Sequence, residues 1–461
     1  MEIQIFGAAK EVTGSCYSLS SKDEKILIDC GLFQGSKENA KKNYEDFPFN
    51  PSKYSALLLT HAHLDHCGRI PKLVKYGFRG KIYATDATKE LAFVIMMDAA
   101  KIAAEDTEHE NKGRAEQGLP PRKPIYNTMD VESTMKLFTI VSYNKEVKIT
   151  KNISSEFFDA GHILGAASIL VKVKDGKKTT SLAFSGDLGQ ENSVLVKNTN
   201  PIKKADYVFV ESTYGDRLHP PREKRNLELV RIIKESYKRG GKLMIPSFAV
   251  ERAQEMLYLI GGFMEQGLIP KMKVYLDSPM AIKATKIFAE HIDYYNDNVK
   301  KNSKLKSPFD FSELVYAETV EQSKEINFIK EPCIVIAGNG MCTAGRIKHH
   351  IKNGINNPQN TLLFIGYQVK GTLGYWIKKG EKIIRLLGTQ VKVKAKIEAI
   401  EGFSAHADSK ELMGWMKSFS PKPKKVFLTH GDEEQSKIFL KKLDNENFSS
   451  SIPAFGEKII L

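Results

Sequence analysis

Long apolar runs are missing from this 461-residue sequence, and none approaches the roughly 20 residues that a membrane-spanning helix requires. The first residues, MEIQIFGAAKEVTG, lack the basic region followed by an apolar region that marks a secretory signal peptide. No internal repeat or low-complexity tract is evident. We therefore expect a cytoplasmic protein without membrane contact.

Cysteines are few, and no C-x-x-C pair occurs among them. The five are Cys16, Cys30, Cys67, Cys333 and Cys342. An odd and scattered set argues against a disulfide framework and a structural zinc knuckle, so we expect reduced thiols.

The remaining composition is that of a globular protein, with 41% hydrophobic and 27% charged residues. Because one core rarely exceeds roughly 250–300 residues, we expect two or three domains. The net charge of +14 favours a polyanionic partner such as nucleic acid. Lysines at 300–306 and 417–425 would add a general, salt-sensitive attraction.

The order of predicted elements changes along the chain. Short strands separated by turns fill the first 204 residues, with a helix at 87–105 and a polar stretch at 106–124 that we interpret as an exposed arm or lid. From about 205, strands alternate with helices, which predicts βαβ units on a parallel sheet. The last 70 residues return to strands and a helix, with strands expected at Val391–Glu401 and Lys425–Thr429.

Four ligand-type side chains directly follow the apolar segment SALLLT: His61, His63, Asp65 and His66. Histidine with carboxylate is a ligand set for zinc, and a catalytic site keeps one position open. Because side chains so close together in the sequence cannot all point to the same position, we expect these four ligands to divide between two metals.

Three further residues share one setting, a polar side chain at the exit of an apolar strand with glycine beside it. They are His162, Asp187 and His430. This setting places side chains along one rim of a sheet, where sites gather in α/β proteins. With the first four they supply a complete two-metal site. Asp29, at the end of KILID, is a candidate for orienting a ligand histidine.

Glu211 and His406 form a candidate acid pair. A histidine near a metal site has an ordinary pKa of about 6.5 and can carry and release a proton near neutrality. A carboxylate would hold that imidazole in place. The two residues are 195 positions apart, so sequence alone does not bring them together.

With these residues in this order, the chain resembles the metallo-β-lactamase superfamily, and the Glu211 and His406 motifs narrow the resemblance to its β-CASP nuclease branch. Five further segments support it: residues 245–253 (IPSFAVERA), 277–281 (DSPMA), 338–342 (GNGMC), 366–368 (GYQ) and 371–374 (GTLG). The resemblance covers essentially the whole chain. It is to prokaryotic RNA-processing enzymes similar to the eukaryotic pre-mRNA 3′-end cleavage subunit.

The resemblance implies two zinc ions per chain. One is held by His61, His63 and His162, the other by Asp65, His66 and His430, and Asp187 bridges them. It also implies that Glu211 and His406 form the acid pair, so that the expected catalytic residues are His406, Glu211, Asp65 and Asp187. Ser404 is expected near the scissile phosphate.

The same resemblance implies an α/β fold, a metallo-β-lactamase αββα sandwich with an inserted β-CASP α/β domain of the parallel-sheet type. An insertion is also required by the 243 residues between Asp187 and His430, far more than the roughly 4–6 that usually connect strands. We expect the metallo-β-lactamase domain at 1–204 and 388–461, the β-CASP domain at 205–387, and the active site in the cleft between them.

The expected reaction is hydrolysis of single-stranded RNA. Two zinc ions would lower the pKa of a bridging water toward about 7 and neutralise phosphodiester charge. His406 would protonate the leaving 3′-oxygen, which gives 5′-phosphate and 3′-hydroxyl ends. We favour an endonuclease with possible 5′→3′ exonuclease activity. The apolar ending Ile459–Leu461 suggests either a core contact or a homodimer.

The glycine-rich segment 338–346 follows an apolar strand and leads into a helix, where backbone amides can bind an anion. Within or beside such loops, Gly340, Arg252, Arg346 and Thr372 are candidates for phosphate contacts. Two other functions stay open. A thioester or lactam hydrolase would use the same metals, and a scaffold subunit of an RNA-processing complex would use none.

Overall fold

The computed structural model describes residues 1–303 and 307–461, so part of the lysine-rich stretch 300–306 lies outside the described residues. The chain divides into two compact units. Unit 1 consists of Met1–Leu218 and His406–Leu461, and unit 2 consists of His219–Ala405. These limits differ from the predicted domain limits at 204 and 387, and strand pairing explains the difference.

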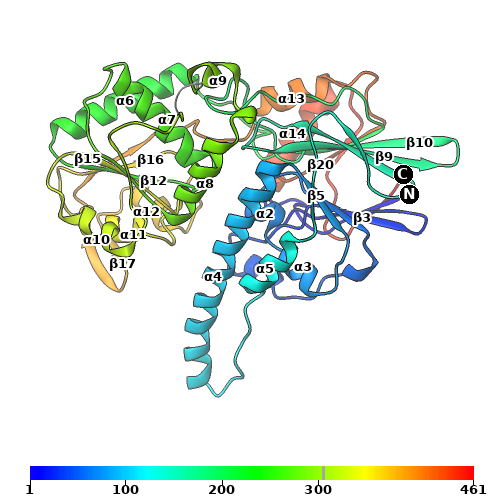
Figure 1. Cartoon of the computed structure of the whole chain (residues 1–461), viewed down its shortest axis with the longest axis horizontal. Helices are drawn as coiled ribbons and strands as arrows, with labels where there is room; N and C mark the ends of the chain where they lie inside the picture. The colour runs from blue at the N-terminus through cyan, green and yellow to red at the C-terminus, as the bar shows by residue number, and fades with distance from the viewer. Residues whose placement is uncertain (304–306) are drawn as a thin grey trace. The chain divides into compact units, whose positions relative to one another are not determined.

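The first sheet of unit 1 has seven strands in the order β22-β1-β2-β3-β4-β5-β6 (Figure 1). They are β1 (Glu2–Ile5), β2 (Tyr17–Ser21), β3 (Glu24–Ile28), β4 (Ala56–Leu58), β5 (Lys81–Ala84), β6 (Phe138–Ile140) and β22 (Lys458–Ile460). From β3 to β6 all neighbours are parallel, so their carboxyl ends lie along one edge.

The second sheet of unit 1 also has seven strands, in the order β21-β20-β11-β10-β9-β8-β7. They are β7 (Glu146–Lys148), β8 (Ile153–Asp159), β9 (Ala167–Asp175), β10 (Lys178–Phe184), β11 (Tyr207–Glu211), β20 (Lys425–Thr429) and β21 (Ser450–Ser451). Strand β11 lies parallel between β10 and β20, which is why unit 1 continues past residue 204.

The core of unit 1 lies between these two sheets. In β8 every second residue from Ile153 is buried, the alternation of a strand with one face on a core. One buried cluster combines side chains of both sheets, including Ile28 and Leu58 of the first and Phe157 and Phe184 of the second. Ile459 joins the same cluster, whereas Ile460 is 74% exposed.

Helices cover the outer faces of both sheets, which confirms the αββα sandwich (Figure 1). Those beside the first sheet are α1 (Lys37–Lys42), η1 (Pro51–Lys53), α2 (Leu64–Cys67), α3 (Ile70–Lys75), α4 (Asp86–Glu116) and α5 (Thr128–Met135). Those beside the second are α13 (Ser409–Lys417) and α14 (Glu433–Asn445). No helix among the described residues is both long and apolar enough to cross a membrane.

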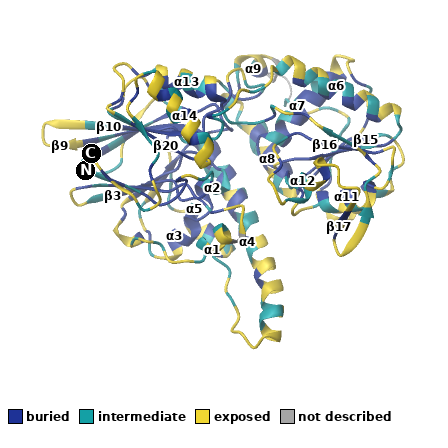
Figure 2. Cartoon of the chain, turned by 180° about the vertical axis from the view of Figure 1, so that it is seen from behind, coloured by how far each residue is buried: buried dark blue, intermediate teal, exposed yellow. Residues whose placement is uncertain are grey.

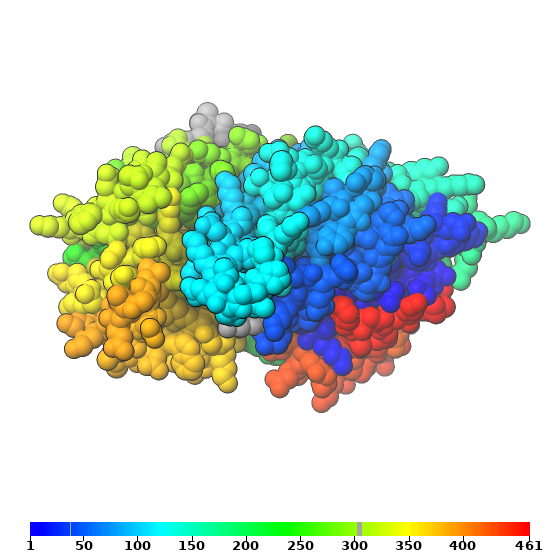
Figure 3. All heavy atoms as spheres, turned by 90° about the horizontal axis from the view of Figure 1, so that it is seen from below, coloured from blue at the N-terminus to red at the C-terminus, as the bar shows by residue number. Residues whose placement is uncertain are grey.

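Helix α4 is longer than predicted, since it continues past residue 105 to Glu116, through the first part of the stretch 106–124 that was interpreted as an exposed arm or lid. The segment 106–116 holds no proline, and it contains three glutamates with one lysine, one arginine and one alanine, all of which are strong helix formers. The outer half of α4 is mostly exposed and, with the returning segment, forms an arm on unit 1 (Figures 2 and 3). Asn111 holds the returning segment, since its side chain accepts from the Arg122 amide (2.7 Å) and donates to the Arg122 carbonyl (2.9 Å).

Unit 2 contains a six-stranded sheet in the order β14-β13-β15-β12-β16-β19, and every neighbouring pair is parallel, as predicted. The strands are β12 (Lys242–Pro246), β13 (Val274–Asp277), β14 (Leu314–Tyr316), β15 (Cys333–Ala337), β16 (Thr361–Phe364) and β19 (Lys396–Ala399). Because β19 pairs with β16, unit 2 continues past residue 387. Strand β15 is buried along its whole length, as expected for a central parallel strand.

Helices cover both faces of this sheet (Figure 1). They are α6 (Arg222–Lys238), α7 (Arg252–Glu265), α8 (Pro279–Glu290), η2 (Ile292–Tyr294), α9 (Asp297–Ser303), α10 (Val320–Glu325), η3 (Ile326–Phe328), α11 (Ile347–Gly354) and α12 (Leu373–Lys378). A separate hairpin pairs β17 (Ile383–Leu386) with β18 (Thr389–Lys392). The single strand predicted at 391–401 is therefore wrong, since β18 and β19 are two strands of different sheets.

Candidate metal centre

The seven predicted metal ligands lie at the carboxyl ends of strands in unit 1. His61 follows β4, His162 follows β8, Asp187 follows β10 and His430 follows β20. The last three strands run parallel to one another, so their ends meet at one edge of the second sheet. The remaining ligands, His63, Asp65 and His66, follow in the loop and short helix after His61.

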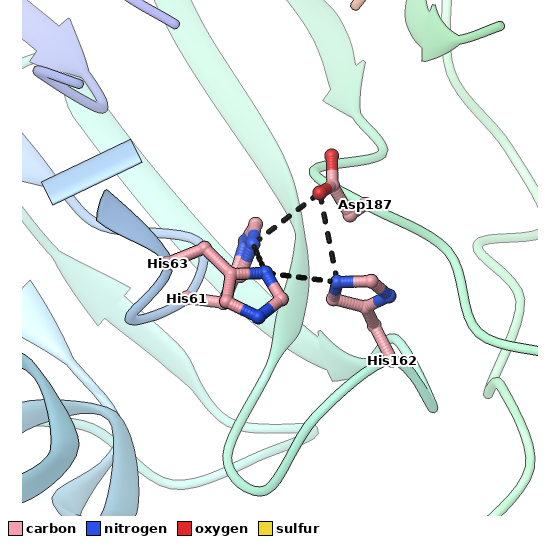
Figure 4. A group of neighbouring side chains, drawn as sticks. All are labelled: His61, His63, His162 and Asp187. Carbon is pink, nitrogen blue, oxygen red and sulfur yellow. Dashed lines mark hydrogen bonds and ion pairs between the residues drawn. The ribbon is translucent and has the colours of Figure 1, made fainter. Parts of the chain in front are cut away.

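One group consists of His61, His63, His162 and Asp187, whose side chains point toward one another (Figure 4). Nδ1 of His63 lies 3.1 Å from Nε2 of His61 and 3.1 Å from Nε2 of His162. Oδ2 of Asp187 lies 3.4 Å from His61 and 3.6 Å from His162. Burial lowers the pKa of His61 to about 3 and that of His63 to about 4, so these imidazoles are neutral near pH 7.

A second group consists of Asp65, His66 and His430. Nε2 of His430 lies 3.2 Å from Nε2 of His66 and 3.3 Å from Oδ2 of Asp65. The backbone of His430 has a positive φ of 46°, an uncommon conformation for a residue with a side chain and one that concentrates at functional sites.

Asp187 faces both groups. Its Oδ2 is directed at the first, and its Oδ1 lies 3.3 Å from His66 and 3.4 Å from His430. Burial alone would raise the pKa of this carboxyl, but the surrounding imidazoles, His430 first, hold it well below its usual value. The carboxylate is therefore charged at the point where the ligand atoms converge.

The donor atoms fit divalent cations. Both oxygens of Asp187 are buried without a hydrogen-bond partner among the described residues, which is costly unless a cation takes that place. Imidazoles with carboxylates are a ligand set for zinc, and each group keeps its ligand atoms within 4.8 Å of one another. The two groups together offer two neighbouring metal positions.

Asp29 accepts hydrogen bonds from one of the predicted metal ligands and from the residue next to another. The sequence suggests it as a residue that orients a ligand histidine. Its Oδ2 accepts from Nδ1 of His66 at 2.8 Å and from the Thr60 hydroxyl at 2.8 Å, and its Oδ1 accepts from the Thr60 amide at 2.8 Å. A hydrogen bond on Nδ1 turns Nε2 of His66 toward the centre. The Thr60 oxygen also lies 3.1 Å from Nδ1 of His61.

Two threonines that contact the metal ligands were not predicted from the sequence. Thr60 stands between Asp29 and the imidazoles, and Thr213 lies against His430. The signal for Thr60 was its position directly before His61 at a strand exit. Thr213 follows β11 by two residues, in the segment Glu211–Thr213, and sequence gave no reason to pair it with a residue 217 positions away.

Glu211 and His406 come together despite their separation. Nδ1 of His406 lies 3.3 Å and 3.4 Å from the two Glu211 oxygens and 3.8 Å from Oδ2 of Asp187. Glu211 is fully buried, and its Oε1 accepts from the Leu188 amide at 2.6 Å. Burial would lower the pKa of His406, but Glu211 and then Asp187 outweigh it and raise the pKa to about 9.

The five predicted substrate contacts, Ser404, Arg252, Gly340, Arg346 and Thr372, all belong to unit 2. The Arg346 guanidinium donates to Asp277 (2.7 Å) and to the Ala317 carbonyl (2.8 Å). Arg252 donates to the Ile365 carbonyl (2.9 Å). Thr372 caps α12 by accepting from the Tyr375 amide (3.3 Å). A phosphate contact by any of the five stays a prediction.

Comparison with known proteins agrees with this geometry. Residues 9–138 match the metallo-beta-lactamase superfamily, residues 253–377 match the Beta-Casp domain, and residues 390–453 match the Zn-dependent metallo-hydrolase RNA specificity domain. The chain is 37% identical over 460 residues to "Ribonuclease TTHA0252" of Thermus thermophilus, covering 100% of both chains.

The chain belongs to the β-CASP ribonuclease family. It is accordingly a metal-dependent hydrolase, and the predicted fold class is confirmed. A second β-CASP relative is "RNase J-like protein" of Methanocaldococcus jannaschii, 31% identical over 95% of this chain and 94% of that protein. "Transcription termination factor FttA" of Methanosarcina mazei is 34% identical over 94% of this chain and 67% of its own length.

One solved structure shares the fold of this β-CASP protein over its whole length. It is the "Crystal Structure of a Protein of Unknown Function from Enterococcus faecalis V583", with a TM-score of 0.57, 15% identity, and coverage of 100% of this chain and 99% of that one.

Proposed function

We propose that the protein hydrolyses phosphodiester bonds of single-stranded RNA with two zinc ions and leaves 5′-phosphate and 3′-hydroxyl ends. The observation that carries the proposal is the placement of Asp187, whose two oxygens face two separate groups of imidazoles. A carboxylate in that position is suited to bridge two cations.

His61, His63 and His162 would hold one ion, Asp65, His66 and His430 the other, and Asp187 both. When bound, such a pair of ions supplies a hydroxide nucleophile near neutral pH and neutralises charge on the scissile phosphate. Asp29 and Thr60 would keep the imidazoles turned toward the centre, because each ring nitrogen that they occupy faces away from it.

His406 would act as the general acid. Its pKa of about 9 means that the ring is protonated at neutral pH, the state required to give a proton to the leaving 3′-oxygen. Since Nδ1 faces Glu211, the proton would be delivered from Nε2 on the opposite side of the ring. Buried Glu211 would fix this orientation and stabilise the charged imidazole.

RNA is supported as the substrate by the net charge of +14, by the match of residues 390–453 to an RNA specificity domain, and by relatives whose names describe ribonucleases. A thioester or lactam substrate has no comparable support. The complete ligand set also argues against a silent scaffold, because such a subunit would have no need of seven converging donors.

Cleavage of circular and linear RNA side by side tests the mode of action. An endonuclease opens the circle, and we expect this result. A strict 5′→3′ exonuclease would degrade only the linear form, preferably one with a 5′-phosphate, and the endonuclease proposal would then be wrong.

Metal content and activity test the site itself. We expect two zinc ions per chain by plasma mass spectrometry, and we expect Asp187→Asn to lose bound zinc and at least about 100-fold in RNA cleavage. Asp206→Asn is a matched control, because this carboxylate in the same unit bonds only to Ser181 and Lys424 among the described residues. An Asp187→Asn protein with two zinc ions and normal cleavage would contradict the proposal.

A further inference from the structure

A basic hollow opens on unit 1, among residues that take no part in the metal centre. It is an open surface depression of about 480 Å³, a size at which proteins hold small ligands or parts of larger ones. Its lining includes Ser55, Arg79, Lys81, Tyr83, Lys148 and Thr150. The hollow lies where the start of β5 approaches the end of β7, so both sheets of the sandwich contribute to it.

Three cations surround the hollow, and all three are exposed. Among the described residues, Lys81 and Lys148 take part in no ion pair. The Arg79 guanidinium is held in place, since its Nη1 donates to the carbonyl oxygens of Val74 and Phe78, both at 2.8 Å. A fixed guanidinium loses less conformational freedom on binding an anion than a mobile one does.

In the part of the chain that the structure describes, the lining of the hollow contains no carboxylate, and two acidic residues on neighbouring strands are engaged elsewhere. Glu24 accepts from the Asn152 amide at 3.3 Å, and Glu146 pairs with Lys172 at 2.5 Å and accepts from the Ser154 hydroxyl at 2.7 Å. The positive charge of the hollow is therefore not neutralised from within. Two hydroxyl side chains, Ser55 and Thr150, add hydrogen-bonding groups to its lining.

Strand register places the hollow at the end of the sandwich opposite the metal centre. Lys148 pairs with Ser154 near the start of β8, and Asp159 at the end of β8 precedes His162. Five residues at about 3.3 Å each separate Ser154 from Asp159 by about 17 Å. Lys81 is likewise paired with Ala56, at the start of the strand that leads to His61.

We propose that this hollow binds backbone phosphates of the RNA substrate at a distance from the scissile bond. The proposal rests on the proposed ribonuclease function. A phosphodiester chain carries the charge that three cations would neutralise, and its length lets it reach from the hollow to the metal centre. A free nucleotide carries the same phosphate group, but the hollow is open at its rim, which favours an RNA strand that runs through it and continues on both sides.

The test compares RNA of two lengths. The hollow variant carries two substitutions, Lys81→Gln and Lys148→Gln. The control variant carries Lys177→Gln and Lys178→Gln, at two exposed lysines in the β9–β10 turn of the same unit. Binding is measured by fluorescence anisotropy over a salt series, with single-stranded RNA of about 20 and about 4 nucleotides, and with uridine monophosphate and inorganic phosphate as competitors.

For the longer RNA, we expect the hollow variant to weaken binding by about 10-fold and to reduce the salt slope by about 0.7 per lysine, or about 1.4 for both. For the shorter RNA the loss should be several times smaller, because a short strand bound at the metal centre leaves fewer phosphates free to reach the hollow. The control variant should bind both RNAs as the wild type does. Thermal unfolding of both variants verifies the fold.

Three results would overturn the proposal. Equal affinity of the wild type and the hollow variant for the longer RNA, with wild-type cleavage intact, would reject the hollow alone. Competition by uridine monophosphate or phosphate at concentrations equal to that of the longer RNA would assign the hollow to a small ligand instead. Absence of RNA cleavage by the zinc-loaded wild type would reject the ribonuclease function and this proposal with it.

Discussion

The Thr213 hydroxyl forms two hydrogen bonds with one residue, His430. It donates to the His430 carbonyl oxygen at 3.0 Å, and its oxygen lies 3.2 Å from Nδ1 of the same residue. Because its proton points to the carbonyl, the oxygen accepts from Nδ1–H. That bond selects the tautomer in which Nε2 carries the lone pair, and Nε2 is the nitrogen that faces Asp65 and His66.

We therefore predict that Thr213→Val selectively weakens the metal position formed by Asp65, His66 and His430. The valine keeps the shape of the threonine and removes the acceptor, and loss of such a supporting bond typically lowers metal affinity about 10–100-fold. Competitive zinc titration should show one weakened and one normal position. Thr213→Ser keeps the hydroxyl and should retain both. Two normal positions in the valine variant would contradict the role.

A second prediction concerns Asp29, which binds both His66 and Thr60. Asp29→Asn removes the charge that accepts these protons, and we expect zinc affinity to fall about 10-fold or more and cleavage to recover partly in excess zinc. Asp175→Asn, at an exposed ion pair with Lys22, is the control and should change neither quantity. Unchanged zinc affinity in Asp29→Asn would show that the ligands keep their orientation without it.

A third prediction separates acid catalysis from metal binding. His406→Ala should lower RNA cleavage by about 10²–10⁴-fold, because the 3′-oxygen leaves poorly without a proton. A phosphodiester with a nitrophenolate leaving group needs no such proton, so its hydrolysis should fall much less. Zinc content should stay at the wild-type level. An equal loss with both substrates would show that His406 serves another step.

A fourth prediction concerns close packing at Gly31, two residues after Asp29. A Cβ added there would lie 1.5 Å from the Asp65 carbonyl oxygen and 2.7 Å from the His66 amide, both backbone atoms. We expect Gly31→Ala to lower the free energy of unfolding by about 3 kcal/mol and to weaken zinc binding. Gly113→Ala meets nothing within 4 Å on exposed α4 and should raise stability by about 0.5–1 kcal/mol. Urea unfolding measures the free energy of unfolding of both variants. An unchanged value for Gly31→Ala would show that the added Cβ causes no clash.

A fifth prediction follows from Asp277 in unit 2. Burial would raise the pKa of this carboxyl, but bonds from His350 (2.5 Å), Ser323 (2.6 Å) and Arg346 (2.7 Å) outweigh burial and lower it below 3.8. A lowered pKa means that the folded state binds this proton less readily than the unfolded state. The stabilisation is therefore present above pH 3.8 and is lost as the pH falls through the lowered pKa.

Asp277→Asn should accordingly destabilise unit 2 by about 3 kcal/mol at pH 7, because it leaves buried donors poorly matched. The difference between variant and wild type should shrink in acid, below pH 3.8. Unfolding followed by circular dichroism across this range gives the measurement. A difference that is constant with pH would mean that the charge of Asp277 contributes nothing.

The residues of the metal centre could largely be predicted from sequence, because several of them lie directly after an apolar strand and this pattern is visible locally. His162, Asp187 and His430 each follow an apolar strand, and the ends of parallel strands meet whatever separates them along the chain. The bounds of β20 also agree with the predicted strand Lys425–Thr429, which is a short, largely apolar run closed by a turn. The joining of Glu211 with His406 depended on the family resemblance.

What sequence did not reveal depends on partners that are far away in the chain. Nothing in the sequence pairs Arg346 with Asp277, 69 residues earlier, whose carboxylate accepts a hydrogen bond from the Arg346 guanidinium. Thr213 carries no local signal, because hydroxyl side chains are common in turns. The hairpin of β17 and β18 was missed for another reason. It turns at Leu387 and Gly388, both with positive φ, and is too short for its alternation to be read.

The order in which the metal ligands are synthesised has a consequence for the cell. Asp187 emerges from the ribosome 243 residues before His430, and all of unit 2 lies between them. Until β20 has been translated and has paired with β11, one edge of the second sheet stays open, and Asp65 and His66 lack the third member of their group, His430. A growing chain therefore has no complete metal centre until nearly the whole sequence has been translated.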